Sequence, residues 1–226
     1  MLMNDVDEIG FSIIQNALSD SDISEFLITL NAAALPRSRA GIRHALRHPA
    51  VEKLANCTKL LNISRSVLGD TAVAFRATLF DKSPESNWLV VWHQDTALPL
   101  QERREVKGWG PWSLKDGVIY AHAPAEALSK ILALRIHLDD STVQNGPLRV
   151  LPGTHSQGVL TDDAIHQNAT QISAMDCIVP KGGILAMRPL LIHSSSKSLT
   201  QMPRRVLHIE YAGSLCLGDD LKLAIA

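Results

Sequence analysis

The spacing of apolar residues changes near residue 70. Before that point apolar residues recur every three or four positions, as on the buried face of a helix, for example at Ile23, Phe26, Leu27 and Leu30. Ser19 or Ser21 is placed to cap this segment, and Pro49 suits the first turn of a second helix that Gly69 would end. We therefore expect a helical start over about residues 1–69.

From Thr71 onward the period is close to two, which is typical of strands. The expected strands are residues 72–81, 87–95, 131–140, 147–152, 172–179, 183–189, 190–195 and 204–212. Gln144 to Gly146 has the chemistry of a hairpin turn, and Gly182-Gly183 that of a second turn. A helical start followed by about eight short strands predicts an α+β fold with a mainly β core, a sandwich or barrel with helices outside.

One predicted strand alternates almost perfectly. Leu132, Leu134, Ile136 and Leu138 share one face, and Arg135, His137 and Asp139 share the other. If helices cover the apolar face, the polar face points into the barrel, where it would need water, a metal or a ligand. If not, the polar face is a solvated outer surface. The strand alone does not distinguish the two.

Residues 96–129 contain several glycines and prolines and are expected to form a long loop. Trp109 and Trp112 lie beside cations in this segment, and His122 near its end is a candidate substrate contact. The functional interpretation is a lid over a binding site, which we favour. The alternative is a solvated loop that the two tryptophans pin to the core.

Composition narrows the possible partners and location. The 226 residues include 22 Lys+Arg and 23 Asp+Glu, so a nucleic-acid binder with a broad basic surface is not expected. The three widely spaced cysteines make no CxxC and no disulfide framework. The acidic start has no signal-peptide pattern, and no apolar run reaches the roughly 18 residues of a membrane span. We expect a cytoplasmic chain with no membrane partner.

The candidate chemistry lies on three of the predicted strands. His93 and Asp95 are two positions apart and therefore share one face of a strand, while Trp92 points the other way. His193 ends an apolar run, and Arg204 begins a strand that we expect to neighbour the His193 strand. Each feature alone has an ordinary structural explanation. Together, two histidines and a carboxylate form the facial triad of non-haem Fe(II) oxygenases, and an arginine can grip a co-substrate carboxylate.

Four stretches resemble the phytanoyl-CoA dioxygenase family of Fe(II)- and 2-oxoglutarate-dependent oxygenases. They are WHQD (92–95), NGPLRVLPGTH (145–155), LLIHSSS (190–196) and PRRVLHIEY (203–211). The resemblance covers about residues 70–213 and, more loosely, the helical start. It implies a double-stranded β-helix, or jelly-roll, core with flanking N-terminal helices in one domain over residues 1–226. Asp95 stands where related halogenating enzymes carry a small residue, so hydroxylation is favoured.

The resemblance also assigns roles residue by residue. It makes His93, Asp95 and His193 the iron ligands, and Arg204 and Ser195 the contacts of 2-oxoglutarate. Arg135 stands where some relatives carry Trp; we place it with the co-substrate residues inside the barrel and leave its role open. The same comparison puts Asp139 and His155 near the substrate, although a structural role for His155 is equally favoured. His137 could line the pocket, but a satisfied core histidine is favoured.

These observations predict an oxidoreductase that uses Fe(II), 2-oxoglutarate and O2 to hydroxylate a small organic molecule, releasing succinate and CO2. Two alternatives stay open. The same barrel could hold another metal for a hydrolase or isomerase, or it could be a non-catalytic binding protein. The sequence indicates neither the substrate nor the oligomeric state.

Overall fold

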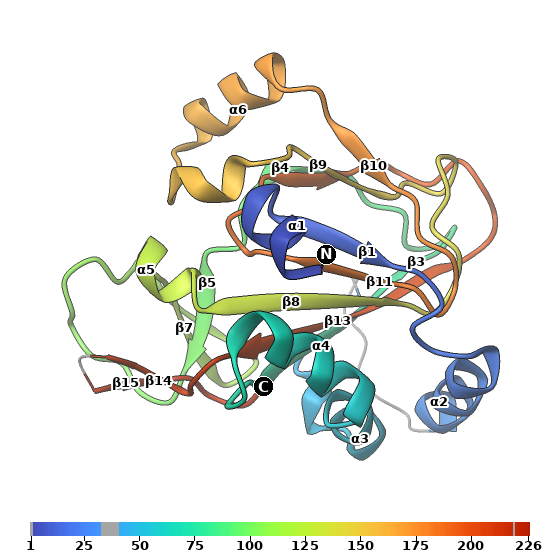
Figure 1. Ribbon diagram of the computed structural model, residues 1–226, viewed down its shortest axis with the longest axis horizontal. Coiled ribbons are helices and arrows are strands. Elements are labelled where there is room, and N and C mark those ends of the chain that lie inside the picture. Colours follow the sequence, from blue (N-terminus) through green and yellow to red (C-terminus); the bar gives the residue numbers. More distant parts are fainter. Residues whose placement is uncertain (1, 33–40, 219) are drawn as a thin grey trace.

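The computed structural model describes residues 2–32, 41–218 and 220–226 (Figure 1). The α-helices are α1 (Leu2–Glu8), α2 (Asp20–Ala32), α3 (Pro49–Ala55), α4 (Thr58–Leu68), α5 (Ala125–Leu128) and α6 (Asp162–Gln171), with 3-10 helices at Ala45–Arg47 and Thr154–Gln157. Among the described residues, no helix is both long and apolar enough to cross a membrane.

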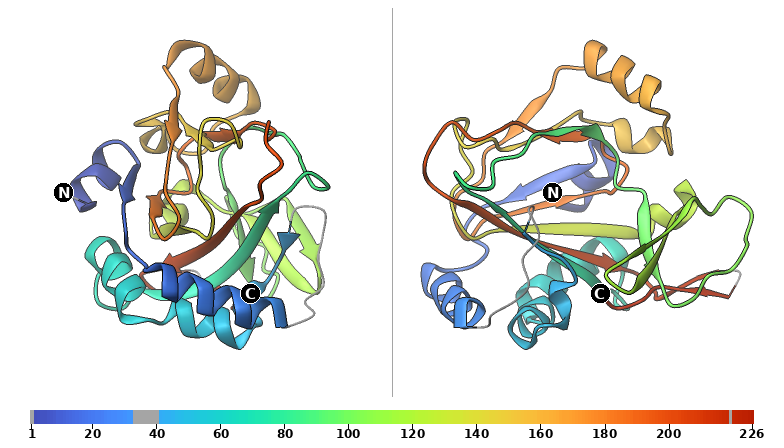
Figure 2. Two further views of the ribbon diagram at one scale, coloured as in Figure 1. Left: turned by 90° about the vertical axis from the view of Figure 1, so that its right-hand side faces the viewer. Right: turned by 180° about the vertical axis from the view of Figure 1, so that it is seen from behind.

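Two antiparallel sheets form the core. The larger has the order β1-β11-β8-β13-β3-β2, and its strands are β1 (Phe11–Ile14), β2 (Gly41–Ile42), β3 (Val73–Lys82), β8 (Ile131–His137), β11 (Ile184–Met187) and β13 (Arg204–Ala212). The smaller has the order β10-β9-β12-β4, from β4 (Val90–His93), β9 (Leu148–Val150), β10 (Met175–Cys177) and β12 (His193–Ser195). Figures 1 and 2 show the smaller sheet stacked over the larger one, with helices α2 to α4 beneath. This arrangement confirms the predicted mainly β core with N-terminal helices outside.

The apolar face of the large sheet packs against the helices. Leu134 and Ile136 on β8 and Ile209 on β13 belong to one buried cluster with Phe26 of α2 and Leu60 of α4. The residues between them on each strand must therefore face the small sheet. This resolves the open question about β8, because its polar face lies inside the barrel.

The helical start begins and ends largely where predicted, but it also contains strands. Ser19 Oγ accepts a hydrogen bond from the backbone N–H of Asp22, Pro49 occupies the first turn of α3, and Gly69 follows α4 with φ of 87°. The second predicted helix is in fact two helices, because the helical conformation is interrupted between α3 and α4. Strands β1 and β2 from this part pair with β11 and β3, so the large sheet includes the N-terminal segment.

Two other predictions were wrong about local topology. The strands on either side of the Gln144–Gly146 turn, β8 and β9, lie in different sheets, so they do not form a hairpin. Residues 96–129 are not one long loop. They form β5 (Ala97–Leu100), β6 (Trp112–Lys115) and β7 (Val118–His122), a third sheet of order β5-β7-β6, before α5. A two-stranded sheet of β14 (Cys216–Gly218) and β15 (Leu221–Lys222) follows β13.

Candidate metal centre

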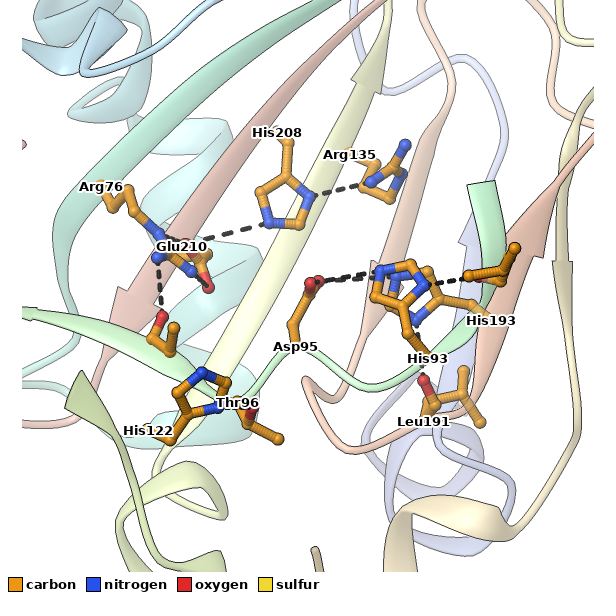
Figure 3. A network of polar contacts seen from close by, with 12 residues as sticks. Arg76, His93, Asp95, Thr96, His122, Arg135, Leu191, His193, His208 and Glu210 are labelled. Carbon is orange, nitrogen blue, oxygen red and sulfur yellow. Dashed lines mark hydrogen bonds and ion pairs between the residues drawn. The ribbon is translucent and has the colours of Figure 1, made fainter. Parts of the chain in front are cut away.

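Strands β4 and β12 bring the two candidate histidines directly opposite each other. His93 and His193 are register partners, and their ring centroids lie 4.2 Å apart. Asp95 follows β4 and turns its carboxylate between them: Oδ1 is 3.6 Å from His93 Nε2, and Oδ2 is 3.5 Å from His193 Nε2. Ligand atoms of all three residues lie within 4.8 Å of one another. Figure 3 shows the three side chains converging on one point.

Backbone carbonyls orient both imidazoles. The Nδ1 atom of His93 lies 2.8 Å from the Val91 oxygen, and Nδ1 of His193 lies 2.8 Å from the Leu191 oxygen. A carbonyl only accepts, so each Nδ1 carries the hydrogen and each Nε2 presents a lone pair toward Asp95. The site therefore has two neutral imidazole donors and one carboxylate, which fits a divalent transition metal such as Fe(II).

Local electrostatics keep these donors ready for a cation. Burial lowers the pKa of His193 to about 4, so its Nε2 is unprotonated at neutral pH. Burial also disfavours the charged form of His93, but the hydrogen bond and charge of Asp95 outweigh it and raise that pKa. Burial opposes ionisation of Asp95, yet the two histidines hold its pKa well below the usual range. The Asp95 carboxylate is thus ionised, and its negative charge favours binding of a divalent cation.

Gln94, between the two ligands on the chain, fixes the end of β4. Its Nε2 donates to the carbonyl oxygens of Leu190 (2.7 Å) and Gly158 (2.9 Å), and its Oε1 accepts from the Leu160 N–H at 2.9 Å. The Asp95 N–H donates to the Pro189 oxygen at 2.9 Å. These bonds tie the segment that carries Asp95 to the segment that leads into His193.

Arg204 and Ser195 meet inside the barrel, although their strands are not neighbours. We predicted that β13 would lie beside the His193 strand, and this was wrong, because β12 and β13 belong to opposite sheets. The side chains instead reach across the interior. Arg204 is 4% exposed, its Nη2 donates to Ser195 Oγ at 3.3 Å, and its Nε donates to the Asn145 oxygen at 3.2 Å.

No pattern in the sequence singles out the next residue of this cluster, Lys82. Its Nζ donates to Ser195 Oγ at 2.9 Å and to the Ser196 oxygen at 2.5 Å. Lys82 stands directly opposite Arg204 in the register of β3 and β13. The pairing of β3 with β13 places Lys82 beside Arg204. Such pairing cannot be predicted from the spacing of residues within a single strand.

A chain of polar contacts crosses the interior face of the large sheet (Figure 3). Arg135 Nη1 lies 3.1 Å from His208 Nδ1, and His208 Nε2 lies 3.9 Å from Glu210 Oε2. Glu210 also holds a two-point ion pair with Arg76. Arg135 lies inside the barrel as predicted. The other three residues were not candidates, because each looks like an ordinary strand residue in the sequence.

Next to Arg135 on the same face, His137 differs from its prediction. It is 1% exposed, and neither of its ring nitrogens has a partner among the described residues. It is therefore not a satisfied core histidine. Burial and then the charges of Arg135 and Arg204 lower its pKa to about 3, so it is neutral. On the same face, Arg135 Nε also lacks a hydrogen-bond partner among the described residues.

Comparison with known proteins agrees with this geometry. Residues 6–206 match the sequence model of the phytanoyl-CoA dioxygenase (PhyH) family. The chain belongs to this family. Two curated relatives are similar: L-proline trans-4-hydroxylase of Streptomyces griseoviridis, 26% identical over 185 residues, and ectoine dioxygenase of Nocardia farcinica, 25% identical over 165 residues. The matches cover 70% and 66% of this chain, but only 61% and 48% of the relatives.

Solved structures show that this PhyH family chain has the jelly-roll fold of its relatives. EctD from S. alaskensis with 2-oxoglutarate and 5-hydroxyectoine superposes with a TM-score of 0.70 at 18% identity, covering 93% of this chain and 74% of that one. The carbocyclase SnoK from nogalamycin biosynthesis gives 0.71 at 17% identity, covering 93% and 82%. At these identities the similarity concerns the fold alone.

The remaining candidates of the PhyH family chain lie in different places. His122 is exposed beside the metal centre, where its Nδ1 lies 2.6 Å from the hydroxyl of Thr96 (Figure 3). Asp139 lies beyond the end of β8 and forms a two-point ion pair with Arg205. His155 Nε2 donates to the Asp7 oxygen at 3.1 Å, which ties it to α1. The contacts of Asp139 and His155 are structural, and their roles toward substrate stay predictions.

The four tryptophans lie in three different environments. Trp92 points away from the metal centre and packs beside α6, under the guanidinium of Arg149. Trp88 precedes β4, and the centroid of its ring lies 5.4 Å from Lys82 Nζ. Trp109 and Trp112 are half-buried against the cluster around β5 and β7. Those contacts are the ones expected of a pinned segment; the lid role stays a prediction.

Proposed function

We propose that this chain is an Fe(II)- and 2-oxoglutarate-dependent dioxygenase that hydroxylates a small organic molecule. The observation that carries the proposal is the convergence of two Nε2 atoms and one carboxylate within 4.8 Å, beside a buried arginine that has no carboxylate partner among the described residues. A hydrolase or isomerase would use the triad but leave Arg204 and Ser195 without a role.

In the proposed reaction, substrate C–H, 2-oxoglutarate and O2 give substrate C–OH, succinate and CO2. Iron(II) bound to His93, Asp95 and His193 would supply the redox chemistry. The protein positions the reactants. Arg204 and Ser195 would hold the far carboxylate of the co-substrate, and its 2-oxo acid end would then lie toward the triad. Arg135 and His137 are buried on the inward face of β8.

The substrate is proposed to be a small molecule, and no nucleic-acid or membrane partner is proposed. The curated relatives act, by their names, on L-proline and ectoine, which supports a small substrate. We also propose that residues 1–226 work as one catalytic domain, because β1 and β2 complete the sheet that carries Arg204. Free thiols at Cys57, Cys177 and Cys216 support the proposed cytoplasmic location.

The test is 2-oxoglutarate turnover by the purified protein with Fe(II) and O2. Even without a prime substrate, slow succinate release is expected, and His93→Ala and Asp95→Ala should abolish it because each removes a ligand. His166→Ala is the matched control, since His166 is an exposed histidine of α6. Succinate release at the wild-type rate by both ligand variants would refute the site, and no release by the wild type would refute the function.

A further inference from the structure

The metal centre opens to solvent on one side. The side chains of His93 and Asp95 have relative exposures of 35% and 31%, whereas that of His193 is 4%. His122, at the end of β7, lies at this opening, because its Nδ1 is 2.6 Å from the hydroxyl of Thr96, the residue that follows Asp95 (Figure 3). His122 is exposed, so a molecule that approaches the metal from solvent meets its imidazole.

Backbone hydrogen bonds fix the place of His122. The Ala123 N–H donates to the Thr96 oxygen at 2.9 Å, and the Gly110 N–H donates to the His122 oxygen at 2.8 Å. These bonds tie the end of β7 to the segment that directly follows Asp95. The imidazole therefore has a defined position relative to the metal ligands.

The length of the contact with Thr96 indicates which nitrogen of His122 carries the hydrogen. Hydrogen bonds that an N–H donates to oxygen usually span about 2.7–3.2 Å, whereas those that a hydroxyl donates are shorter, about 2.5–3.0 Å. At 2.6 Å, the Thr96 hydroxyl is the donor and Nδ1 is the acceptor. The ring hydrogen then lies on Nε2. This nitrogen has no hydrogen-bond partner among the described residues, so it can donate to a ligand.

The same face of the third sheet carries a lysine. Lys115 of β6 is directly opposite Val118 of β7, so both side chains point to one face. Alternation along β7 puts Tyr120 and His122 on that face as well. The Lys115 ammonium lies over the Tyr120 ring, with Nζ 4.8 Å from the ring centroid. This face therefore presents a cation and a hydrogen-bond donor together.

Lys115 has no acid partner among the described residues, unlike the two arginines near it. Arg76, beside the same tyrosine ring, is paired with Glu210. Arg43 is paired with Asp116 at 3.7 Å. Burial, followed by the charges of Arg76 and Arg43, lowers the pKa of Lys115. An anion bound on this face would stabilise the charged form of the lysine.

We propose that His122 and Lys115 bind an acidic group of the substrate, and that the prime substrate is therefore a small carboxylic acid. The inference rests on the proposed function and deepens it. His122 Nε2 donates a hydrogen bond to a carboxylate oxygen, and Lys115 supplies the opposite charge. Thr96 is a positioning residue, because its hydroxyl orients the imidazole. One N–H donor and one cation match a singly charged carboxylate, whereas a phosphate dianion would need more positive charge.

The experiment measures succinate release by the Fe(II)-loaded protein with matched probes. The probes are valine, 4-methylpentanoate, cyclohexanecarboxylate and phenylacetate, and each acid is compared with its primary amide. At least one acid should raise the rate fivefold or more over the rate without substrate, and its amide should stay within twofold of that rate. Equal stimulation by acid and amide, or no stimulation by any of the acids, would overturn the proposal.

The stimulating acid is then tested on variants. Lys115→Met and His122→Ala should each raise the KM for this acid at least tenfold. Thr96→Val should raise it at least threefold, whereas Thr96→Ser, which keeps the hydroxyl, should retain the wild-type value. Lys53→Met on α3 and His166→Ala on α6 remove exposed residues far from β6 and β7 in the sequence. They are the matched controls and should behave as wild type.

The outcomes separate this inference from the proposed function. If either Lys115→Met or His122→Ala keeps the wild-type KM, the two residues do not form one acid-binding site. Slow succinate release by the wild type without any response to the acids contradicts the inference alone. A wild type that neither binds 2-oxoglutarate nor releases succinate refutes the proposed function itself.

Discussion

Individual side chains at this site are held by bonds of different strength. Backbone carbonyls hold His93 and His193, so the imidazoles keep their orientation whether or not a metal is bound. Arg204 is held by one carbonyl and one hydroxyl, both neutral. Its positive charge is therefore available to a ligand. Burial, and then Arg135, lowers the pKa of Arg204 to about 10, so it is charged at pH 7.

Arg204→Met should mainly weaken the binding of 2-oxoglutarate. The substitution keeps the bulk but removes a charge-assisted contact, which typically contributes about 2 kcal/mol or roughly 30-fold in affinity. The KM for 2-oxoglutarate in succinate formation reports the loss. Arg205→Met is the control, since Arg205 is paired with Asp139 instead. Equal KM values for wild type and Arg204→Met would remove Arg204 from the anchor.

At the scale of elements, β13 connects the two halves of the interior. Its inward residues run from Arg204, through Val206 and His208, to Glu210. The strand thus links the proposed co-substrate anchor to the ion pair of Glu210 with Arg76 on β3. Glu210 is 1% exposed, and Arg76 also donates to the Ala97 oxygen at 2.8 Å, which joins the large sheet to β5.

Glu210→Gln should destabilise the fold, because it leaves the charge of Arg76 buried and unpaired. Breaking one side of such a pair costs about 3–5 kcal/mol in the free energy of unfolding. Urea unfolding measures the change. The control is Asp176→Asn, which breaks the half-exposed pair with Arg149 and should cost less than about 1 kcal/mol. Similar losses of unfolding free energy in the two variants would contradict the expectation that the buried Arg76–Glu210 pair is the more important one.

Strand patterns could predict much of the fold but only part of the site. Two-residue alternation places His93 and Asp95 on one face and Arg135 inside, because both follow from geometry within one strand. The place of Lys82 beside Arg204 depends on which strands pair, and the position of Trp88 depends on where β4 begins. Alternation within one strand gives no information on strand pairing or strand ends. For the same reason it could not reveal that β12 and β13 lie in different sheets.

For the whole molecule, Tyr211 joins the barrel to its helical layer. Its ring is completely buried on the outer face of β13, and its hydroxyl donates to the Ala55 oxygen at the end of α3 over 2.7 Å. The bond also satisfies one of the carbonyls that a helix leaves unpaired at its C-terminus. Helix α3 is short, so such contacts decide how firmly it is held.

Tyr211→Phe should lower the free energy of unfolding by about 1 kcal/mol, since it removes one buried hydrogen bond and keeps the packing. Tyr211→Ala also leaves a cavity and should cost about 3–5 kcal/mol. Thermal unfolding followed by circular dichroism compares the two. If Tyr211→Phe proved as harmful as Tyr211→Ala, the hydroxyl, rather than the ring, would dominate the contribution of this residue.

The opposition of His93 and His193 across β4 and β12 has a consequence for folding. The two residues are 100 positions apart in the chain (193 − 93), yet they are direct partners in the sheet. An unfolded chain cannot present them together with Asp95, so a metal that needs all three ligands binds the native state and stabilises it. At a free metal concentration 100 times the dissociation constant, this linkage adds about 2.7 kcal/mol to the free energy of unfolding. Metal supply would then help to determine how much of the protein is folded.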